Sequence, residues 1–300
     1  MRIAFVANLD ADRELDDPER YRPSTRSAAA SAARAAPLRA QIAALFGAPV
    51  DVLVPGRPVR RSAAAAAVCW SPTPRALALL VEAGAPVPDA PPLAVLHRVN
   101  HRAFAAALDP GLPGARFVRS LGELRDALAR QPGAGARGHL LERAFGFAGR
   151  GRKVLAPSPA LEGALRTWIE ASFTEHGGGL QVEPLVDVDA EFALHGLLDR
   201  AGRVVLGEPC RQEVDARGAW IATARAGDAL PPAERDALAG AAARVAAALH
   251  ASGYFGPFGI DAYRWRDGAG ALRFQALGEL NARLTMGWFT GMGDRARQIV

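Results

Sequence analysis

Two strands near the end of the chain are predicted to form a β-hairpin, and this hairpin constrains the fold more than any other feature. The strands are residues 258–266 (FGIDAYRWR) and 272–283 (LRFQALGELNAR), and DGAG between them is typical of a hairpin turn. Folding about this turn brings Asp261 within a residue or two of the position opposite Glu279. The chain therefore closes on antiparallel strands that carry two neighbouring carboxylates.

Polar residues alternate along the second strand of this hairpin. Glu279, Asn281 and Arg283 lie at every second position, so their side chains project from one face of the sheet. With Asp261 they offer two carboxylates and an amide oxygen, which are ligands that suit Mg²⁺. The alternative is a solvated edge strand whose charges pair with their neighbours.

Composition narrows the class of protein. Three hundred residues, half of them hydrophobic, suffice for two compact domains with a sizeable core. Cys69 and Cys210 are far apart and lack metal-ligand spacing, so we expect two buried thiols in a reducing compartment. The start of the chain has no signal-peptide pattern, and the run AAAAAVCW is too short to cross a bilayer. We therefore expect a cytoplasmic protein without a membrane partner.

The net charge of +5 does not by itself indicate nucleic-acid binding. The arginines are distributed among acids without a basic run or interleaved aromatic residues, which favours solvated side chains. We expect no nucleic-acid partner.

The first part of the chain alternates strands and helices. The sequence predicts, in order, strand 3–8, helix 26–46, strands 50–54 and 66–70, and helix 75–84. This order indicates a small parallel sheet. Four prolines in residues 86–92 (PVPDAPP) mark a boundary, so the first predicted domain is 1–92.

The remainder of the chain is predicted to be α+β with largely antiparallel sheets. Strand 139–145 (HLLERAF) leads into the loop 146–153 (GFAGRGRK), and a helix follows, for which Ser158 is the candidate cap. From residue 180 strand follows strand, interrupted by one long helix over 231–253. The glycines of the loop allow backbone N–H groups to approach a polyphosphate, although P-loop spacing is absent.

The series of motifs resembles the ATP-grasp superfamily of carboxylate ligases. From about Ser71 to Arg283 the segments VNHRAF, HLLERAF, GFAGRGRK, LQVEPLV, GPFGIDAY and ELNAR stand in the order of that family. The resemblance implies an α/β N-terminal Rossmann-like domain, followed by an α+β ATP-grasp module of two subdomains with largely antiparallel sheets. The small lid subdomain is predicted at 93–181 and the C-terminal subdomain with the magnesium site at 182–300.

The resemblance also implies an ATP site. Glu183 is expected at the adenine amino group, with the backbone of Leu185 and Val186 at the base edge. Glu191 is expected at the ribose hydroxyls, and Asp189 is the alternative because the spacing is one residue longer than in the family. The residues expected at the phosphates are Arg102, Arg143, Gly149, Arg150, Gly151 and Lys153.

Two of these residues depart from the family pattern. Arg102 and Arg143 stand where the family usually has lysines, and arginine keeps the charge but differs in geometry. Lys153 is the only lysine of the chain, and a chance surface lysine is its alternative interpretation.

The resemblance places the reacting groups on the closing hairpin. Asp261, Glu279 and Asn281 match the magnesium ligands of the family, and Arg283 matches an arginine that steadies phosphate or the reacting carboxylate. Arg211 is expected to face the same site if its strand lies beside the hairpin, with a surface salt bridge as the alternative.

The implied activity is an ATP- and Mg²⁺-dependent ligase that joins a small-molecule carboxylate to an amine through an acyl phosphate. The alternatives are a nucleotide-binding module with little turnover and a small-molecule kinase on the same fold. We also expect a homodimer as a possible state of assembly.

Overall fold

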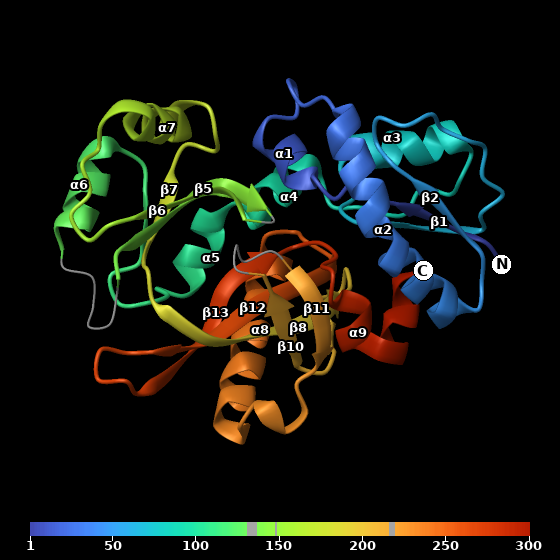
Figure 1. The fold of residues 1–300 in the computed structure, drawn as a ribbon. Coiled ribbons are helices and arrows are strands. Elements are labelled where there is room, and N and C mark those ends of the chain that lie inside the picture. Colours follow the sequence, from blue (N-terminus) through green and yellow to red (C-terminus); the bar gives the residue numbers. More distant parts are fainter. Residues whose placement is uncertain (131–136, 148, 216–219) are drawn as a thin grey trace.

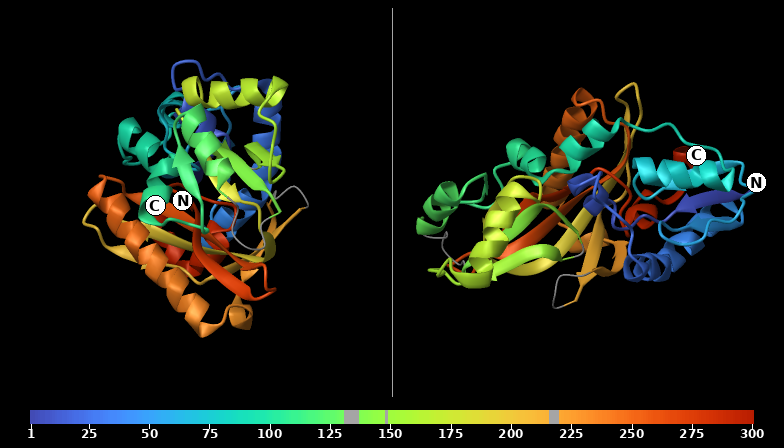
Figure 2. Two further views of the ribbon diagram at one scale, coloured as in Figure 1. Left: turned by 90° about the vertical axis from the view of Figure 1, so that its left-hand side faces the viewer. Right: turned by 90° about the horizontal axis from the view of Figure 1, so that it is seen from above.

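The computed structural model describes residues 1–130, 137–147, 149–215 and 220–300. These residues form an elongated molecule in which three β-sheets follow one another (Figures 1 and 2). The N-terminal sheet lies at one end, a four-stranded sheet lies at the other end, and a six-stranded sheet lies between and below them.

The N-terminal sheet is parallel, as the alternation of strands and helices predicted. Its order is β2-β1-β3, with β1 (Ile3–Val6), β2 (Val50–Leu53) and β3 (Ala66–Cys69). Side chains of β1 alternate between two cores, one shared with α2 (Thr25–Phe46) and the other with α3 (Pro74–Ala83). The short helix α1 (Ala11–Asp16) follows β1 and was not predicted. The likeness of this unit to a Rossmann-like domain stays a prediction.

The second sheet is antiparallel and carries the glycine-rich segment. Its order is β4-β7-β5-β6, with β4 (Arg116–Val118), β5 (His139–Phe147), β6 (Arg150–Leu155) and β7 (Leu180–Pro184). Helices α6 (Leu121–Ala129) and α7 (Gly163–Thr174) pack on this sheet, whereas α4 (Leu93–Asn100) and α5 (Arg102–Leu108) contribute to the core of the six-stranded sheet. The predicted cap at Ser158 is wrong, because α7 begins five residues later, after Glu162. The boundary predicted at 181/182 falls inside β7.

The third sheet is also antiparallel and holds the closing hairpin. The order is β11-β10-β8-β12-β13, and β9 pairs with β8 outside this path. The strands are β8 (Asp187–Leu198), β9 (Val204–Leu206), β10 (Cys210–Val214), β11 (Trp220–Arg225), β12 (Gly256–Arg266) and β13 (Leu272–Asn281). Helix α8 (Pro232–Ala251) covers one face, and the short 3₁₀ turn η1 (Gly227–Ala229) precedes it. The opposite face turns toward the four-stranded sheet (Figure 1).

The C-terminal segment returns to the N-terminal sheet. Helix α9 (Trp288–Met292) and the 3₁₀ helix η2 (Gly293–Ile299) lie beside α2. Trp288 is fully buried and its Nε1 donates a hydrogen bond to the Gly196 carbonyl at 3.0 Å, so it belongs to the core rather than to a pocket wall. Both cysteines are buried and free, as expected. In the part of the chain that the structure describes, every helix is too short or too polar to cross a membrane.

Candidate active site

The closing hairpin brings two carboxylates and an amide together. Asp261 lies directly opposite Glu279 in the β12–β13 register, and Asn281 lies opposite Gly259. The Asn281 Nδ2 donates a hydrogen bond to Asp261 Oδ2 at 3.0 Å, which leaves the amide oxygen available as a ligand. Gln212 on β10 donates to Asp261 Oδ1 at 2.6 Å. The sequence analysis did not identify Gln212.

The charge of this cluster favours a bound cation. Burial, and next the neighbouring carboxylate of Glu279, raise the pKa of Asp261 to about 7, while the hydrogen bond from Gln212 acts against the shift. Within the described residues, no group of three His, Cys, Asp or Glu side chains is placed to hold a metal. Two carboxylates and an amide oxygen nevertheless fit Mg²⁺, which is often held by one or two carboxylates while water and phosphate complete its shell.

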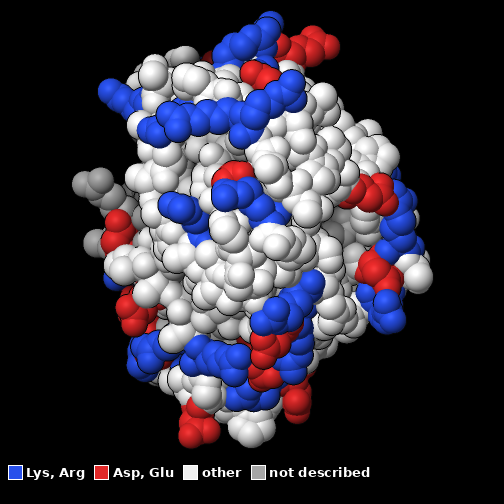
Figure 3. Space-filling model, turned by 90° about the vertical axis from the view of Figure 1, so that its right-hand side faces the viewer, with Lys and Arg blue, Asp and Glu red and all other residues white. Residues whose placement is uncertain are grey.

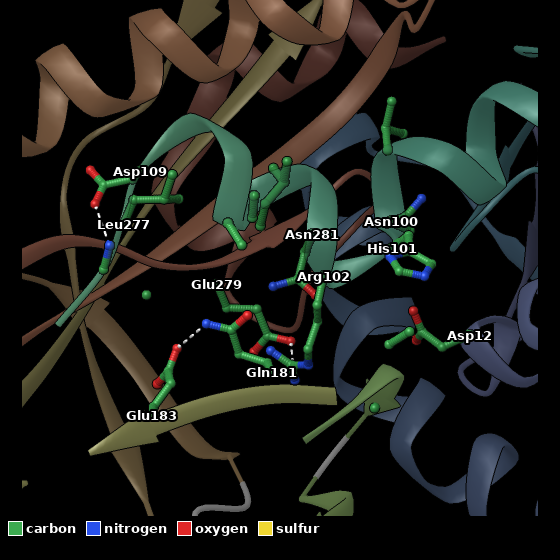
Figure 4. Close-up of a pocket in the computed structure, with 18 residues that line it drawn as sticks. Asp12, Asn100, His101, Arg102, Asp109, Gln181, Glu183, Leu277, Glu279 and Asn281 are labelled. Carbon is green, nitrogen blue, oxygen red and sulfur yellow. Dashed lines mark hydrogen bonds and ion pairs between the residues drawn. The ribbon is translucent and has the colours of Figure 1, made fainter. Parts of the chain in front are cut away.

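Arg102 bridges the hairpin and the four-stranded sheet. Its Nη2 lies 3.0 Å from Glu279 Oε1 and 3.3 Å from Glu142 Oε1, as Figure 4 shows for Glu279. Burial opposes its charge, but Glu142 and then Glu279 outweigh that cost and raise the pKa of the guanidinium. The preceding residue fixes the start of α5, because His101 Nδ1 accepts a hydrogen bond from the Ala103 N–H at 3.1 Å. Arg102 therefore places a permanent positive charge beside the carboxylates.

A cleft of about 340 Å³ lies between the four-stranded and six-stranded sheets. Both sheets contribute residues to it, and the end of β7 with the segment that leads into β8 lines one wall through Glu183, Pro184, Leu185 and Val186. Nine of the predicted site residues line this cleft: Arg102, Gly149, Arg150, Glu183, Leu185, Val186, Glu191, Asp261 and Glu279. The structure thus gathers most of the predicted nucleotide site around one cavity. Ala148 of the glycine-rich segment lies outside the described residues.

Two predicted phosphate-binding residues lie on the other face of the sheet. Arg143 pairs with buried Leu180, and its Nε donates to Ser172 Oγ at 3.0 Å while its guanidinium lies 4.8 Å from the Trp168 ring centre. Lys153 also approaches that ring, with Nζ at 5.9 Å. The physical reason is strand alternation, since the residues next to them project into the cleft instead.

The residues next to Arg143 and Lys153 are the ones whose side chains project into the cleft. Glu142 and Arg152 pair with each other across β5 and β6 and line the cleft. Gly151 lies in the irregular part of this pairing at φ 75°, and a Cβ there would lie 3.5 Å from that of Arg143. Gly151 is therefore next to the cleft wall rather than part of its lining.

A β-bulge in β8 distinguishes Glu191 from Asp189. The register with β12 passes from Ala190 opposite Arg264 to Val188 opposite Trp265, which leaves Asp189 as the extra residue. Asp189 turns to Arg266, whose Nη2 lies 2.6 Å from its Oδ1. Glu191 faces the cleft. Of the two carboxylates, Glu191 is the one that lines the cavity.

Arg211 does not reach the site. Strand β8 lies between β10 and the hairpin, and on β10 it is Gln212 that points at Asp261. Arg211, the preceding residue, projects from the opposite face and is exposed. Arg211 was expected to face the site only if its strand lay directly beside the hairpin, and β10 does not lie there.

Arg283 forms a buried ion pair with Asp12 of α1. Its Nη2 lies 3.0 Å from Asp12 Oδ2 and its Nε lies 3.5 Å from Oδ1, and the guanidinium stacks 5.4 Å from the centre of the Trp70 ring. Arg283 also lines a second cavity of about 260 Å³, which Asp261, Glu279 and Asn281 share. The sequence analysis missed Asp12, because its partner is 271 residues away.

Solved structures resemble this fold, although no protein-family model and no curated protein sequence matches the chain. The biotin carboxylase domain of Hydrogenobacter thermophilus 2-oxoglutarate carboxylase aligns with a TM-score of 0.54 and 15% identity, over 94% of this chain and 64% of that one. D-alanyl-alanine synthetase A of Vibrio cholerae aligns with a TM-score of 0.59 and 12% identity, over 100% and 93%. The chain has the ATP-grasp fold. N5-carboxyaminoimidazole ribonucleotide synthetase of Thermus thermophilus, another protein of this superfamily, aligns with a TM-score of 0.50 and 17% identity, over 95% and 72%.

The chain spans less than two thirds of the biotin carboxylase domain and 26% of Rhizobium etli pyruvate carboxylase, a further match. At these identities the likeness establishes the fold alone.

Ionisation of Glu183, which lines the cleft, is expected to lower the stability of the folded protein. Burial, and next the charge of Glu142, raise its pKa to about 7, while Arg102 acts in the opposite direction. A raised pKa means that the folded state binds more protons than the unfolded chain between about pH 4.5 and 7, so stability falls as pH rises through this window. Glu183→Gln is expected to stabilise the protein by roughly 1–3 kcal/mol at pH 8 and by little at pH 4. Urea unfolding at both pH values measures this, with exposed Glu82→Gln as the control. Equal effects of Glu183→Gln at the two pH values would contradict the assignment.

Proposed function

We propose that this protein is an ATP- and Mg²⁺-dependent ligase that joins a carboxylate to an amine through an acyl phosphate. The observation that carries the proposal is the convergence of Asp261, Glu279 and Asn281 with Arg102 at the cleft between two sheets. The resembling structures support it, because several of them are described as complexes with ADP or ATP, one with its magnesium salt.

The adenine end of the nucleotide fits the segment that follows β7. The N–H and carbonyl of Leu185 already bond to Gly138 and Arg137 at 2.9 and 2.8 Å. Within the described residues the N–H of Val186 has no partner, so we assign the contact to the base edge to Val186. Glu191 then takes the ribose hydroxyls, since its carboxylate lines the same cleft.

The phosphate end fits the positive charges and carboxylates of the cleft. Arg102, Arg150 and Arg152 are the basic residues that line it. Asp261, Glu279 and the amide oxygen of Asn281 would hold Mg²⁺, which when bound offsets negative charge on phosphate oxygens. Gly149, at φ 73°, has a conformation that glycine favours, and its backbone N–H is a donor that we assign to the phosphates. Charge and positioning therefore account for catalysis without a protein nucleophile.

The second cavity suits the carboxylate substrate. It adjoins the metal-binding residues and is otherwise lined mainly by Leu9, Arg34, Trp70, Trp220 and Met286. A carboxylate oxygen there attacks the γ-phosphorus of ATP, and the bond from this phosphorus to the bridging oxygen of ADP breaks. The products of this step are an acyl phosphate and ADP. The amine then attacks the acyl carbon, phosphate leaves, and the amine loses a proton to solvent. Arg283 acts as a positioning residue, because its guanidinium is held by Asp12.

A nucleotide-binding module with little turnover is the second candidate. The observation that favours it is Arg143, which occupies a position where the family usually has lysine and turns toward Trp168 instead of the cleft. Release of ADP and phosphate with panels of carboxylates and amines separates the two candidates. A kinase on this fold would instead yield ADP and a stable phosphorylated product.

A matched pair of arginine substitutions tests the placement of the phosphates. Arg102→Met is expected to weaken Mg-ATP binding by at least about ten-fold, because it removes a buried positive charge from the cleft. Arg143→Met is expected to change the affinity less than about two-fold, because its guanidinium contacts α7. Isothermal titration of both variants provides the measurement. A larger loss in Arg143→Met would place the phosphates on the opposite face of the sheet.

A further inference from the structure

A separate hollow, of about 680 Å³, lies along the outer edge of the N-terminal sheet. Strand β2 lines it over its whole length, helix α2 provides one wall through Ala32, Ala35 and Ala36, and residues 54–61 provide the other. This part of the molecule is distant from the cleft, at the opposite end of Figure 1. It plays no part in the proposed ligase chemistry.

The hollow has a strong positive charge. Between residues 20 and 81 the sequence has nine arginines and a single acid, Asp51, so this segment carries +8 in a chain whose net charge is +5. Four of these arginines line the hollow: Arg39, Arg57, Arg60 and Arg61. Figure 3 shows this side of the molecule, where basic side chains stand in several groups and acidic side chains lie beside some of them.

These four guanidinium groups have no acidic partner within the described residues. Asp51, the one acid that lines the hollow, is already held by Arg2 at 2.6 Å and by Ser62 Oγ at 2.7 Å. Arg39, Arg57, Arg60 and Arg61 are all exposed. The hollow therefore has positive charge that an acidic ligand can neutralise.

The floor of the hollow is an unpaired strand edge. In the parallel pairing of β1 and β2, Ile3 N–H bonds to the Pro49 carbonyl and Ala7 N–H to the Leu53 carbonyl, so the odd-numbered residues of β2 direct their backbone groups toward β1. The N–H and C=O groups of Val50 and Val52 consequently point to the outer edge. In the described part of the chain no strand pairs there, because β2 ends the sheet. Such an edge accepts an added strand through main-chain hydrogen bonds.

We propose that this hollow binds an extended acidic segment of a partner protein, which adds to β2 as a further strand. Backbone groups of the segment bond to Val50 and Val52, and its carboxylates pair with the arginines at the rim. Side chains on the alternate face of the added strand pack on the alanines of α2. Nucleic acid fits less well, because the residues that line the hollow include no aromatic ring on which a base can stack.

Fluorescence anisotropy with a labelled peptide of about ten residues, alternating Glu and Val, tests this proposal. The native protein is expected to bind this peptide saturably, and the affinity is expected to fall as salt is added. No binding is expected for the matching peptide that alternates Lys and Val. Arg57→Glu with Arg60→Glu is expected to weaken binding at least about ten-fold, whereas the control pair Arg125→Glu with Arg130→Glu, on α6 and at its C-cap, changes it less than about two-fold. Val52→Pro, which removes one outward N–H, is also expected to weaken binding, in protein whose circular dichroism is native.

Three results would overturn the proposal. These are no saturable binding of the acidic peptide, equal losses in the two double variants, or unchanged binding in natively folded Val52→Pro. Tighter binding of an oligothymidylate, lost in Arg57→Glu with Arg60→Glu, would assign the surface to nucleic acid instead.

Discussion

Replacing Glu279 by alanine is expected to reduce Mg²⁺-dependent release of ADP by more than about 100-fold. The substitution removes one of the two carboxylates of the hairpin and leaves Asp261 and Asn281 as the only other donors of this set. The fold should persist, because Arg102 retains Glu142 as its ion-pair partner. A coupled assay for ADP, with circular dichroism to verify folding, makes the measurement.

The matched control for this substitution is Glu82→Ala. Glu82 is an exposed carboxylate on α3, remote from the cleft, so its loss is expected to leave ADP release unchanged. Unchanged turnover in Glu279→Ala would refute the role of the hairpin in metal binding. Equal losses in both variants would indicate a general effect on folding.

Replacing Asp12 by alanine is expected to destabilise the folded protein by about 3–5 kcal/mol, because it leaves the charge of Arg283 buried without its partner. The side chains of Arg283 and Asp12 are 9% and 6% exposed, so solvent cannot replace the lost carboxylate. The pair also joins α1 of the N-terminal unit to the segment that follows the closing hairpin. Urea unfolding monitored by circular dichroism measures the change in free energy.

A double variant separates the ion pair from general packing. Asp12→Leu combined with Arg283→Met removes both charges and keeps apolar volume, so it is expected to cost much less than Asp12→Ala. A loss below about 1 kcal/mol in Asp12→Ala would show that water reaches the guanidinium. A double variant as unstable as the single one would show that shape, not charge, makes this contact important.

Local sequence was sufficient to predict the hairpin and its carboxylates. The DGAG turn fixes which strands pair, and alternation then places Asp261 opposite Glu279 with only a small uncertainty in register. The parallel N-terminal sheet followed in the same way from the order of its strands and helices. Turn chemistry and the periodicity of apolar residues carry this information within short segments.

The errors arose where a side chain depends on distant parts of the chain. Arg143 and Lys153 were expected in the cleft, but strand alternation directs their side chains to the opposite face, and which face of β5 and β6 borders the cleft depends on how the two sheets pack. Arg211 was misplaced because strand order, with β8 between β10 and the hairpin, cannot be read from any one strand. Asp189 and Glu191 became distinguishable only through the bulge in β8.

The most direct test of the magnesium site is a crystal structure of the protein with Mn²⁺ and a non-hydrolysable ATP analogue, in which anomalous scattering locates the metal. We expect a metal peak between Asp261 and Glu279, within about 2–2.5 Å of carboxylate oxygens, with the adenine at Val186. A nucleotide bound elsewhere, or a metal peak away from the hairpin, would contradict the proposed site.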